Sequence, residues 1–176
     1  MRALKIFEHI SLDGVIQNSP DENNFPIGDW TAAYRSPEGR DMVLAMQGAK
    51  FDLLLGRRTY DMWSGYWPKT PSSPMADCLN EATKYVVTHR PESLSWGPAK
   101  AIGSDFVENV RSLKSSGDLD LILWGSSTLT SSLLESGLVD EIFLLVYPIM
   151  LGTGKRLFTE GSLPRSFELI SSQATP

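Results

Sequence analysis

Three short segments of the chain place glycine or hydroxyl residues beside arginine or a helix start, at points where an apolar run ends. They are residues 56–59 (Gly-Arg-Arg-Thr), 88–90 (Thr-His-Arg) and 125–128 (Gly-Ser-Ser-Thr). The free N–H groups at a helix N-terminus bind anions, and arginine pairs with phosphate through charge-assisted hydrogen bonds. Each segment alone is equally consistent with a tight turn and solvated arginines. Together they predict a site for a phosphorylated dinucleotide.

The elements that must position these segments alternate between strands and helices. Apolar periodicity and capping residues predict helices from Pro37 to about Gly48, over 57–63, from Ser104 to about Gly117, and from Ser126 or Ser127 to Gly137. Predicted strands cover residues 3–10, 51–55, 84–88, 99–102, 119–124, 139–147 and 167–171. Long loops are expected over residues 17–37 and 65–74.

This alternation indicates an α/β fold, a three-layer sandwich around a mostly parallel central sheet. The carboxyl ends of parallel strands share one edge, where ligands bind in open sheets. The three segments are therefore expected to converge. Because no long helix separates the last two predicted strands, we expect antiparallel pairing at the C-terminal edge.

Composition narrows the function classes. The 176 residues fit one domain, 1–176, and a net charge of −5 with a pI near 5.0 disfavours binding to nucleic acid or to an anionic membrane. No apolar stretch is long enough to span a bilayer, and the N-terminus leads into a strand rather than a signal peptide. We expect a soluble, cytoplasmic protein. With one cysteine, Cys78, and two histidines, the chain has no disulfide framework and no predicted metal site.

Three well-known functional motifs match this sequence only in part. Residues 152–154 (Gly-Thr-Gly) begin like a Rossmann fingerprint, but Leu157 takes the place of the third glycine. Gly154-Lys155 resembles the end of a P-loop, yet Arg156 replaces its serine or threonine. Residues 125–129 imitate a nucleophile elbow, but Leu129 replaces the closing glycine. A Rossmann enzyme, a P-loop NTPase and a serine hydrolase are all disfavoured.

Several short motifs follow one another in an order that is more informative than any one of them. They are residues 11–14 (Ser-Leu-Asp-Gly), 56–60 (Gly-Arg-Arg-Thr-Tyr), 124–129 (Trp-Gly-Ser-Ser-Thr-Leu), 140–141 (Asp-Glu) and the glycines and apolar residues of 148–158. Their order and spacing resemble the dihydrofolate-reductase-like superfamily over almost the whole chain. The closer resemblance is to the C-terminal reductase domain of the bifunctional riboflavin-biosynthesis deaminase-reductase.

The resemblance implies a sheet of about eight strands, NADPH bound at the strand ends, and hydride transfer to a heterocycle. That substrate would be pterin-like, as for dihydrofolate reductases, or ribosylamino-pyrimidine-like, as for 5-amino-6-(5-phosphoribosylamino)uracil reductases. The implied cofactor contacts are Gly56, Arg57, Arg58, Thr59, Thr88, His89, Arg90, Gly125, Ser126, Ser127, Thr128 and Leu129. It also predicts a strained backbone, cis or far from standard dihedral angles, at the Gly125–Ser126 junction.

Two carboxylates and two aromatic residues are the candidates for the substrate end. Asp13 or Asp41 would steer a proton, and Trp30 and Tyr60 would contact the substrate ring. Trp30 and the aromatic run Trp63, Tyr66 and Trp67 could also stack a flat ring, or could cover the core. Asp13 is also explained as a turn residue before a glycine, and Asp41 as a charge at a helix N-terminus. Both alternatives remain open from the sequence.

One departure from the resemblance favours other functions. Trp124 stands where riboflavin-pathway reductases often carry an acid. A nucleotide-binding module without efficient catalysis is the second interpretation, and a structural adaptor the third. The apolar residues 143–147 and 149–151 exceed what one small sheet covers readily, so we expect a homodimer.

Overall fold

The computed structural model describes residues 1–19, 25–158 and 164–175. Within them, six strands form one all-parallel sheet in the order β4-β3-β2-β5-β1-β6. The strands are β1 (Leu4–Ser11), β2 (Asp52–Gly56), β3 (Lys84–Val87), β4 (Ala99–Ile102), β5 (Leu121–Trp124) and β6 (Glu141–Tyr147). The α/β fold with a parallel sheet was predicted correctly.

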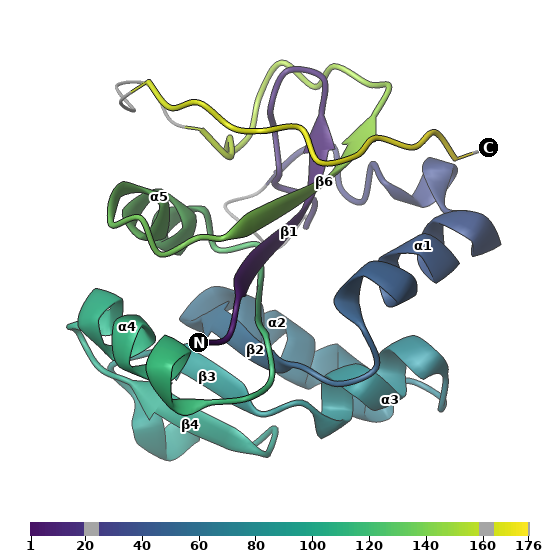
Figure 1. The fold of residues 1–176 in the computed structure, drawn as a ribbon. Coiled ribbons are helices and arrows are strands. Elements are labelled where there is room, and N and C mark those ends of the chain that lie inside the picture. The colour runs from purple at the N-terminus through teal and green to yellow at the C-terminus, as the bar shows by residue number, and fades with distance from the viewer. Residues whose placement is uncertain (20–24, 159–163, 176) are drawn as a thin grey trace.

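Helices cover both faces of the sheet (Figure 1). On one face lie α1 (Pro37–Gln47), α2 (Arg57–Tyr66) and α3 (Pro74–Glu81); on the other lie α4 (Phe106–Ser116) and α5 (Ser127–Glu135). Short 3-10 turns occur at Ala32–Tyr34, Trp67–Lys69 and Pro91–Ser93. The helices leave the strand ends open at one edge, where the connections after β1, β2 and β5 emerge.

Apolar runs in the central strands produce these layers. Leu53, Leu54 and Leu55 have no exposed surface, as expected for a strand buried on both faces of a parallel sheet. Alternate residues face opposite layers: Leu53 and Leu55 pack toward α1, α2 and α3, and Leu54 packs toward α4 and α5. The strict alternation fixes which side chains of each strand can reach a given helix.

The expected eight strands and antiparallel C-terminal edge are not found among the described residues. β6 pairs with β1 in parallel along its whole length, because α5 crosses over the sheet between β5 and β6. Residues 167–171, predicted as a strand, have no regular structure, and Leu169 is 80% exposed. The antiparallel pairing found instead is a single bridge between Val15 and Arg156.

Helix α3 was not predicted, because the loop expected over residues 65–74 ends where the helix begins and no element was assigned to the residues after it. Its start signals are nevertheless present: the Ser73 hydroxyl accepts a hydrogen bond from Ala76 N–H, and Pro74 takes the first helical position. Ser36 and Pro37 do the same for α1, which was predicted correctly. The apolar face of α3 is short, with Ala76 and Leu79 buried, which explains why periodicity alone did not reveal it.

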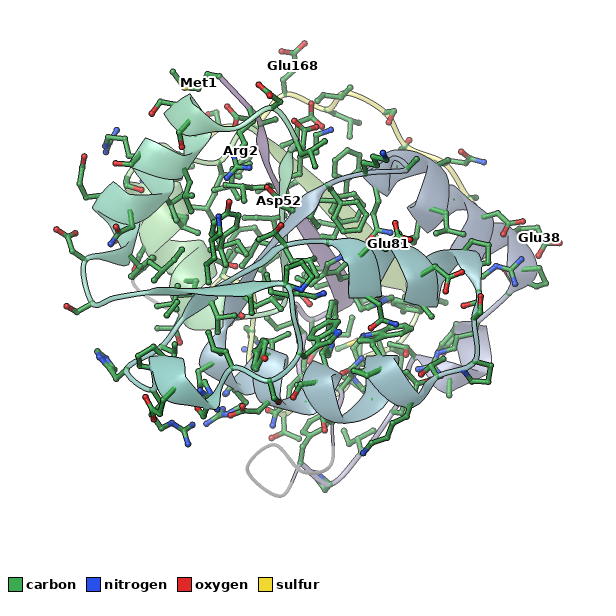
Figure 2. The ribbon with its side chains drawn as sticks, turned by 90° about the horizontal axis from the view of Figure 1, so that it is seen from below. Met1, Arg2, Glu38, Asp52, Glu81 and Glu168 are labelled. Atoms are coloured by element: carbon green, nitrogen blue, oxygen red, sulfur yellow. The ribbon has the colours of Figure 1, made fainter. Side chains whose placement is uncertain are left out.

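A buried ion pair joins the segment before β1 to the amino end of β2 (Figure 2). Arg2 Nη1 lies 2.6 Å from Asp52 Oδ2, and the Arg2 side chain is 2% exposed. Arg2 also donates to the carbonyl oxygens of Leu113 and Leu119. This guanidinium therefore ties the chain terminus to β2 and to the α4–β5 connection, at the edge opposite the strand carboxyl ends.

A second buried cation, Lys84, has no carboxylate partner among the described contacts. Its Nζ donates to the carbonyl oxygens of Asn80 (2.6 Å) and Gly97 (3.4 Å) and lies 4.2 Å from the Trp96 ring centroid. Burial lowers the pKa of this amine to about 8. The folded protein thus releases this proton at a lower pH than the unfolded chain does.

That shift predicts a pH dependence of stability. Between about pH 8 and 10.5 the unfolded chain holds the Lys84 proton and the folded protein does not, so the free energy of unfolding should rise with pH, by on the order of 3 kcal/mol. Urea unfolding of Lys84→Met should lack this rise, and the exposed control Lys50→Met should retain it. Identical pH profiles for Lys84→Met and the unmodified protein would contradict the burial of a charged amine.

Candidate active site

A cleft of about 1690 Å³ lies at the carboxyl ends of the strands. Its walls come from the ends of β1, β2, β5 and β6, from α1 and α2, and from the first turn of α5. Residues 56–59 and 125–129 face it together, although about 70 residues separate them in sequence. The structure thus brings together two of the three segments that the sequence singled out.

Direct contacts lock these two segments to each other. Gly56 N–H donates to Ser126 Oγ at 2.9 Å, and Thr59 Oγ1 lies 3.1 Å from the same oxygen. A Cβ atom on Gly56 would lie 2.7 Å from Ser126 Oγ, closer than such atoms pack. Glycine is therefore required at position 56 by the close approach of the second segment.

The backbone at the Gly125–Ser126 junction is left-handed at both residues. Gly125 has φ 61°, and Ser126 has φ 61° and ψ 53°. Non-glycine residues adopt this region rarely and at a cost in energy, so the dihedral form of the expected strain is found. Its cis form is not, since the cis peptide among the described residues is Gly97–Pro98. After this turn, α5 begins at Ser127 with its first residues facing the cleft.

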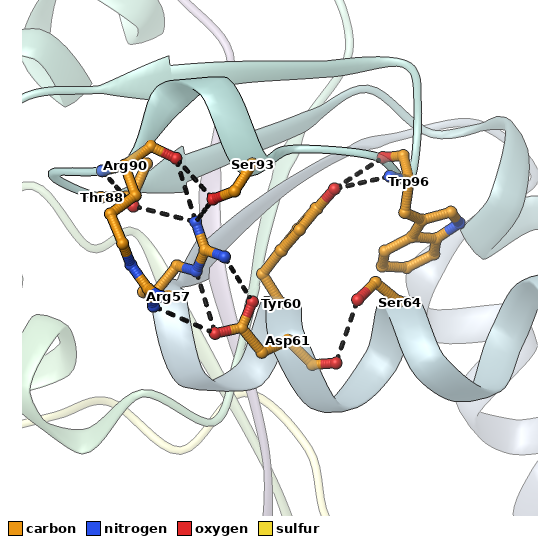
Figure 3. Close-up of polar contacts among 8 residues, drawn as sticks. All are labelled: Arg57, Tyr60, Asp61, Ser64, Thr88, Arg90, Ser93 and Trp96. Atoms are coloured by element: carbon orange, nitrogen blue, oxygen red, sulfur yellow. Dashed lines mark hydrogen bonds and ion pairs between the residues drawn. The ribbon is translucent and has the colours of Figure 1, made fainter.

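Arg57 lines the cleft, but its guanidinium is bound by its own chain (Figure 3). Its guanidinium contacts both carboxylate oxygens of Asp61, at 2.9 and 2.8 Å. It also donates to Ser93 Oγ (2.7 Å), to the Arg90 carbonyl oxygen (3.1 Å) and to Thr88 Oγ1 (3.3 Å). Asp61 raises the Arg57 pKa. Arg57 therefore fastens the segment after β3 to α2.

The third segment, residues 88–90, contacts Arg57 but does not line the cleft. Thr88 is buried and accepts from Arg90 N–H, whereas His89 and Arg90 are exposed. The Arg90 guanidinium lies 3.5 Å from Asp61. Arg58 is exposed as well, but unlike His89 and Arg90 it lines the cleft.

The two predicted carboxylates do not line the cleft. Asp13 accepts hydrogen bonds from Ser11 Oγ and from the N–H groups of Leu151 and Gly152, and these bonds hold its pKa well below the usual range. It clamps the turn after β1 to the loop after β6. Asp41 is exposed on α1 and pairs with Arg40. Neither carboxylate is placed to pass a proton to a ligand in the cleft.

The two predicted substrate-contacting aromatics are core residues. Trp30 is 5% exposed and donates its Nε1–H to the Gln17 carbonyl oxygen. Tyr60 is 1% exposed, and its hydroxyl accepts from Trp96 N–H at 2.7 Å. Burial against the sheet removes both from the cleft. The aromatic residues that do line it are Tyr34, Trp63, Tyr66, Trp67, Trp124 and Tyr147.

Sequence reasoning missed a pair of polar side chains on β1 and β6. His9 Nδ1 and Tyr147 Oη lie 2.7 Å apart, and both residues line the cleft. Burial, with a smaller contribution from Arg35, lowers the His9 pKa to about 4, against the opposing effect of Asp29; burial also raises the Tyr147 pKa. Period-two alternation from Phe7 to His9 could have placed this histidine on the cleft face.

The family is decided by a full-length match. A sequence profile of the RibD C-terminal domain matches residues 2–176. The chain belongs to the RibD C-terminal domain family. This confirms the resemblance drawn from the motif order.

Individual relatives of this RibD C-terminal domain carry more limited information. The Bacillus subtilis (strain 168) protein YyaP, itself uncharacterized, is 30% identical over 112 residues, which cover 61% of this chain. The chain thus spans 59% of the length of that relative.

Two solved structures show the same fold. A putative riboflavin biosynthesis protein from Shewanella sp. PV-4 has a TM-score of 0.70 at 22% identity, covering 97% of this chain and 91% of its own. Dihydrofolate reductase from Enterococcus faecalis, solved with NADP(H) and RAB-propyl, has a TM-score of 0.59 at 16% identity, covering 90% and 77%. The RibD domain described above therefore has a dihydrofolate-reductase-like fold.

Two kinds of feature are absent from the described part of this RibD domain. None of its helices is both long and apolar enough to cross a membrane. Likewise, residues 1–19, 25–158 and 164–175 contain no group of three or more histidine, cysteine or acidic side chains arranged to hold a metal ion.

Proposed function

We propose that this RibD C-terminal domain is an NADPH-dependent reductase that transfers a hydride to a small nitrogen heterocycle, pterin-like or ribosylamino-pyrimidine-like. One observation carries the proposal: the left-handed Gly125–Ser126 turn packs against Gly56 and presents the first turn of α5 to the cleft. A backbone cradle of this kind leaves room for a pyrophosphate beside free N–H groups. NADPH supplies the hydride when bound.

The residues of the cleft suit an anionic dinucleotide. Its cationic lining residues are Arg35, Arg40, Arg57, Arg58 and Lys155, whereas its acidic ones are Glu8 and Asp29. Three of these cations, Arg35, Arg40 and Arg57, are paired with Asp29, Asp41 and Asp61, and the whole chain has a net charge of −5. The N–H groups at the start of α5 would bind the pyrophosphate, and Arg58 would pair with the 2′-phosphate that NADPH has and NADH lacks. The Enterococcus faecalis dihydrofolate reductase, which has the same fold, is complexed with NADP(H), and this supports the choice of cofactor.

The tryptophans would hold a flat substrate. Trp63 and Trp124 line the cleft with ring centroids 6.3 Å apart, and Trp67 packs edge-on against Trp63. Trp124 is fixed by a hydrogen bond from its Nε1–H to Gln47 Oε1 at 3.0 Å. Flat heterocycles gain contact area against such rings. The residues of the cleft would thus bind and orient NADPH and the heterocycle and exclude water from them.

A second candidate is a NADPH-binding module without efficient catalysis. It is favoured by the absence of Asp13 and Asp41 from the cleft lining and by Trp124 in place of the acid often seen in riboflavin-pathway reductases. The cofactor half of the site is the same for both candidates. Only turnover separates them.

The test is NADPH oxidation with a panel of dihydropterins and ribosylaminopyrimidines. We expect at least one of these substrates to accelerate the loss of reduced-nicotinamide absorbance in proportion to protein concentration. NADPH binding with no turnover across the panel would support the module instead.

We also propose that the protein lies in the cytoplasm, because the free thiol of Cys78 fits the reducing conditions there.

We also propose a homodimer formed along β6, one of the two edge strands of the described sheet. Its outward side chains and the loop after it are exposed and apolar, with Val146 59% and Met150 74% exposed. Apolar strand edges of this kind form interfaces. Light scattering should give twice the 19.5 kDa chain mass, and Val146→Lys should shift the mass toward one chain. A monomer at micromolar concentration of the unmodified protein would reject the dimer.

A further inference from the structure

Two side chains without formal charge at neutral pH meet beside the turn assigned to the cofactor. His9 lies on β1 and Tyr147 ends β6, and their side chains share one hydrogen bond of 2.7 Å. Trp124 immediately precedes Gly125 in sequence, and the centroid of its ring lies 5.5 Å from the centroid of the His9 ring. His9 is therefore one strand and Tyr147 two strands away from β5, which leads into the left-handed turn, on the same open edge of the sheet.

The Tyr147 hydroxyl has a fixed place. Trp30 packs edge-on against the Tyr147 ring at 5.3 Å, and Tyr34 does so at 5.5 Å. The His9 ring also packs against it, with the ring centroids 5.6 Å apart. A ring held by three neighbours has little rotational freedom, and this is the preorganisation that a catalytic group needs. Trp30, proposed from the sequence as a substrate contact, thus acts as a support behind Tyr147.

We propose that Tyr147 binds the substrate heterocycle through its hydroxyl and gives it a proton, and that His9 is the positioning residue that holds and recharges this hydroxyl. The proposal rests on the reductase function proposed above. The ligand class that fits is a planar, uncharged heterocycle with a reducible C=N bond, held between aromatic rings. Neither residue was a candidate from the sequence.

The chemical step balances with these groups. The substrate carbon of the C=N bond gains a hydride, and the π electron pair moves to the nitrogen, which takes the proton from Tyr147 Oη as the O–H bond breaks. The phenolate then takes a proton from His9 Nδ1 while a solvent proton adds at Nε2. The imidazole ends neutral as the Nε2–H tautomer, and proton exchange with solvent restores the Nδ1–H tautomer for the next turnover. The net reaction consumes one hydride and one proton.

The charged surroundings agree with this use of a neutral imidazole. Asp29 and Arg35 face the pair and bind each other through Asp29 Oδ2, and Glu8 lines the same cleft from β1. The low His9 pKa keeps the ring neutral near pH 7, so that one nitrogen donates while the other accepts. Tyr34 is the remaining titratable neighbour of Tyr147.

The test measures binding of 7,8-dihydropterin to the NADP⁺-saturated chain by calorimetry, together with the imidazole NMR signals, because the oxidised cofactor cannot transfer a hydride during the titration. The chain has two histidines, so the His9 signals are readily separated from those of exposed His89. Dihydropterin should shift the His9 signals and leave those of His89 in place. Tyr147→Phe, which keeps the ring and removes only the hydroxyl, should weaken dihydropterin binding about tenfold. The matched control Tyr85→Phe, outside the cleft, should bind normally.

Turnover separates positioning from recognition. Tyr147→Phe should lower kcat for dihydropterin on the order of 100-fold, the size expected for loss of a proton donor. His9→Ala should lower kcat more than it raises KM, with His9→Asn restoring part of kcat by holding the hydroxyl. Unchanged dihydropterin affinity in Tyr147→Phe, or unmoved His9 signals, overturns the proposal. Failure of the unmodified protein to bind NADPH, measured in a titration without dihydropterin, would instead overturn the reductase function.

Discussion

Replacing Gly56 with valine should weaken NADPH binding by roughly 30-fold or more, which corresponds to about 2 kcal/mol. The added Cβ would meet Ser126 Oγ at 2.7 Å and Ser126 Cβ at 3.2 Å. Overpacking of this kind costs about 1–3 kcal/mol and is relieved by backbone shifts. The element that must move is the left-handed turn that presents α5 to the cleft. Calorimetric titration with NADPH measures the effect.

Gly65 offers a matched control for this substitution. It lies in α2, near Gly56 in sequence, but a Cβ there would meet no atom within 4 Å. Gly65→Val should therefore bind NADPH normally. Circular dichroism must show both variants folded. Normal NADPH affinity in a folded Gly56→Val variant would show that the contact between residues 56 and 126 does not shape the cofactor site.

Replacing Arg2 with methionine should lower the free energy of unfolding by about 3–5 kcal/mol. The substitution leaves the Asp52 carboxylate, only 11% exposed, without the guanidinium that lies 2.6 Å away. It also removes the donors to the Leu113 and Leu119 carbonyl oxygens. A buried charge that loses its partner keeps its full desolvation cost. Urea unfolding followed by tryptophan fluorescence measures the loss.

The double variant Arg2→Met, Asp52→Leu tests the physical cause. Because it removes the stranded carboxylate as well, it should recover a large part of the lost stability. The pair sits at the edge of the sheet opposite the cleft, so NADPH affinity at low temperature should be unchanged in both. Equal instability of the single and double variants would mean that packing around Arg2, rather than the unpaired charge, accounts for the loss.

The sequence was sufficient for elements whose signals are local. The three buried leucines of β2 and the Ser-Pro start of α1 identify those elements without any knowledge of their neighbours. Sheet order is a long-range choice and was not accessible in the same way. The period-two pattern of residues 139–147 indicates a strand, but its parallel pairing with β1 depends on α5 crossing the sheet.

The same distinction between local signals and long-range contacts applies to the candidate site. Glycine beside hydroxyl residues located the Gly56 and Ser126 segments, and fold resemblance placed them together. The spacing of Arg57 and Asp61, four residues apart on a helix, was a visible sign that this arginine binds its own chain. His9 and Tyr147 are 138 residues apart, so their contact could not be inferred without the strand order.

The central claim is that the cleft binds a phosphorylated dinucleotide, and a titration of the unmodified protein with NADPH and NADH tests it most directly. Trp63, Trp67 and Trp124 line the cleft, so energy transfer from tryptophan to the reduced nicotinamide reports binding. A charged hydrogen bond to the 2′-phosphate contributes about 1.5–3 kcal/mol, so NADPH should bind at least about tenfold more tightly than NADH. Arg58→Ala should remove this difference. Equal dissociation constants for the two cofactors, or no binding of either at millimolar concentration, would contradict the claim.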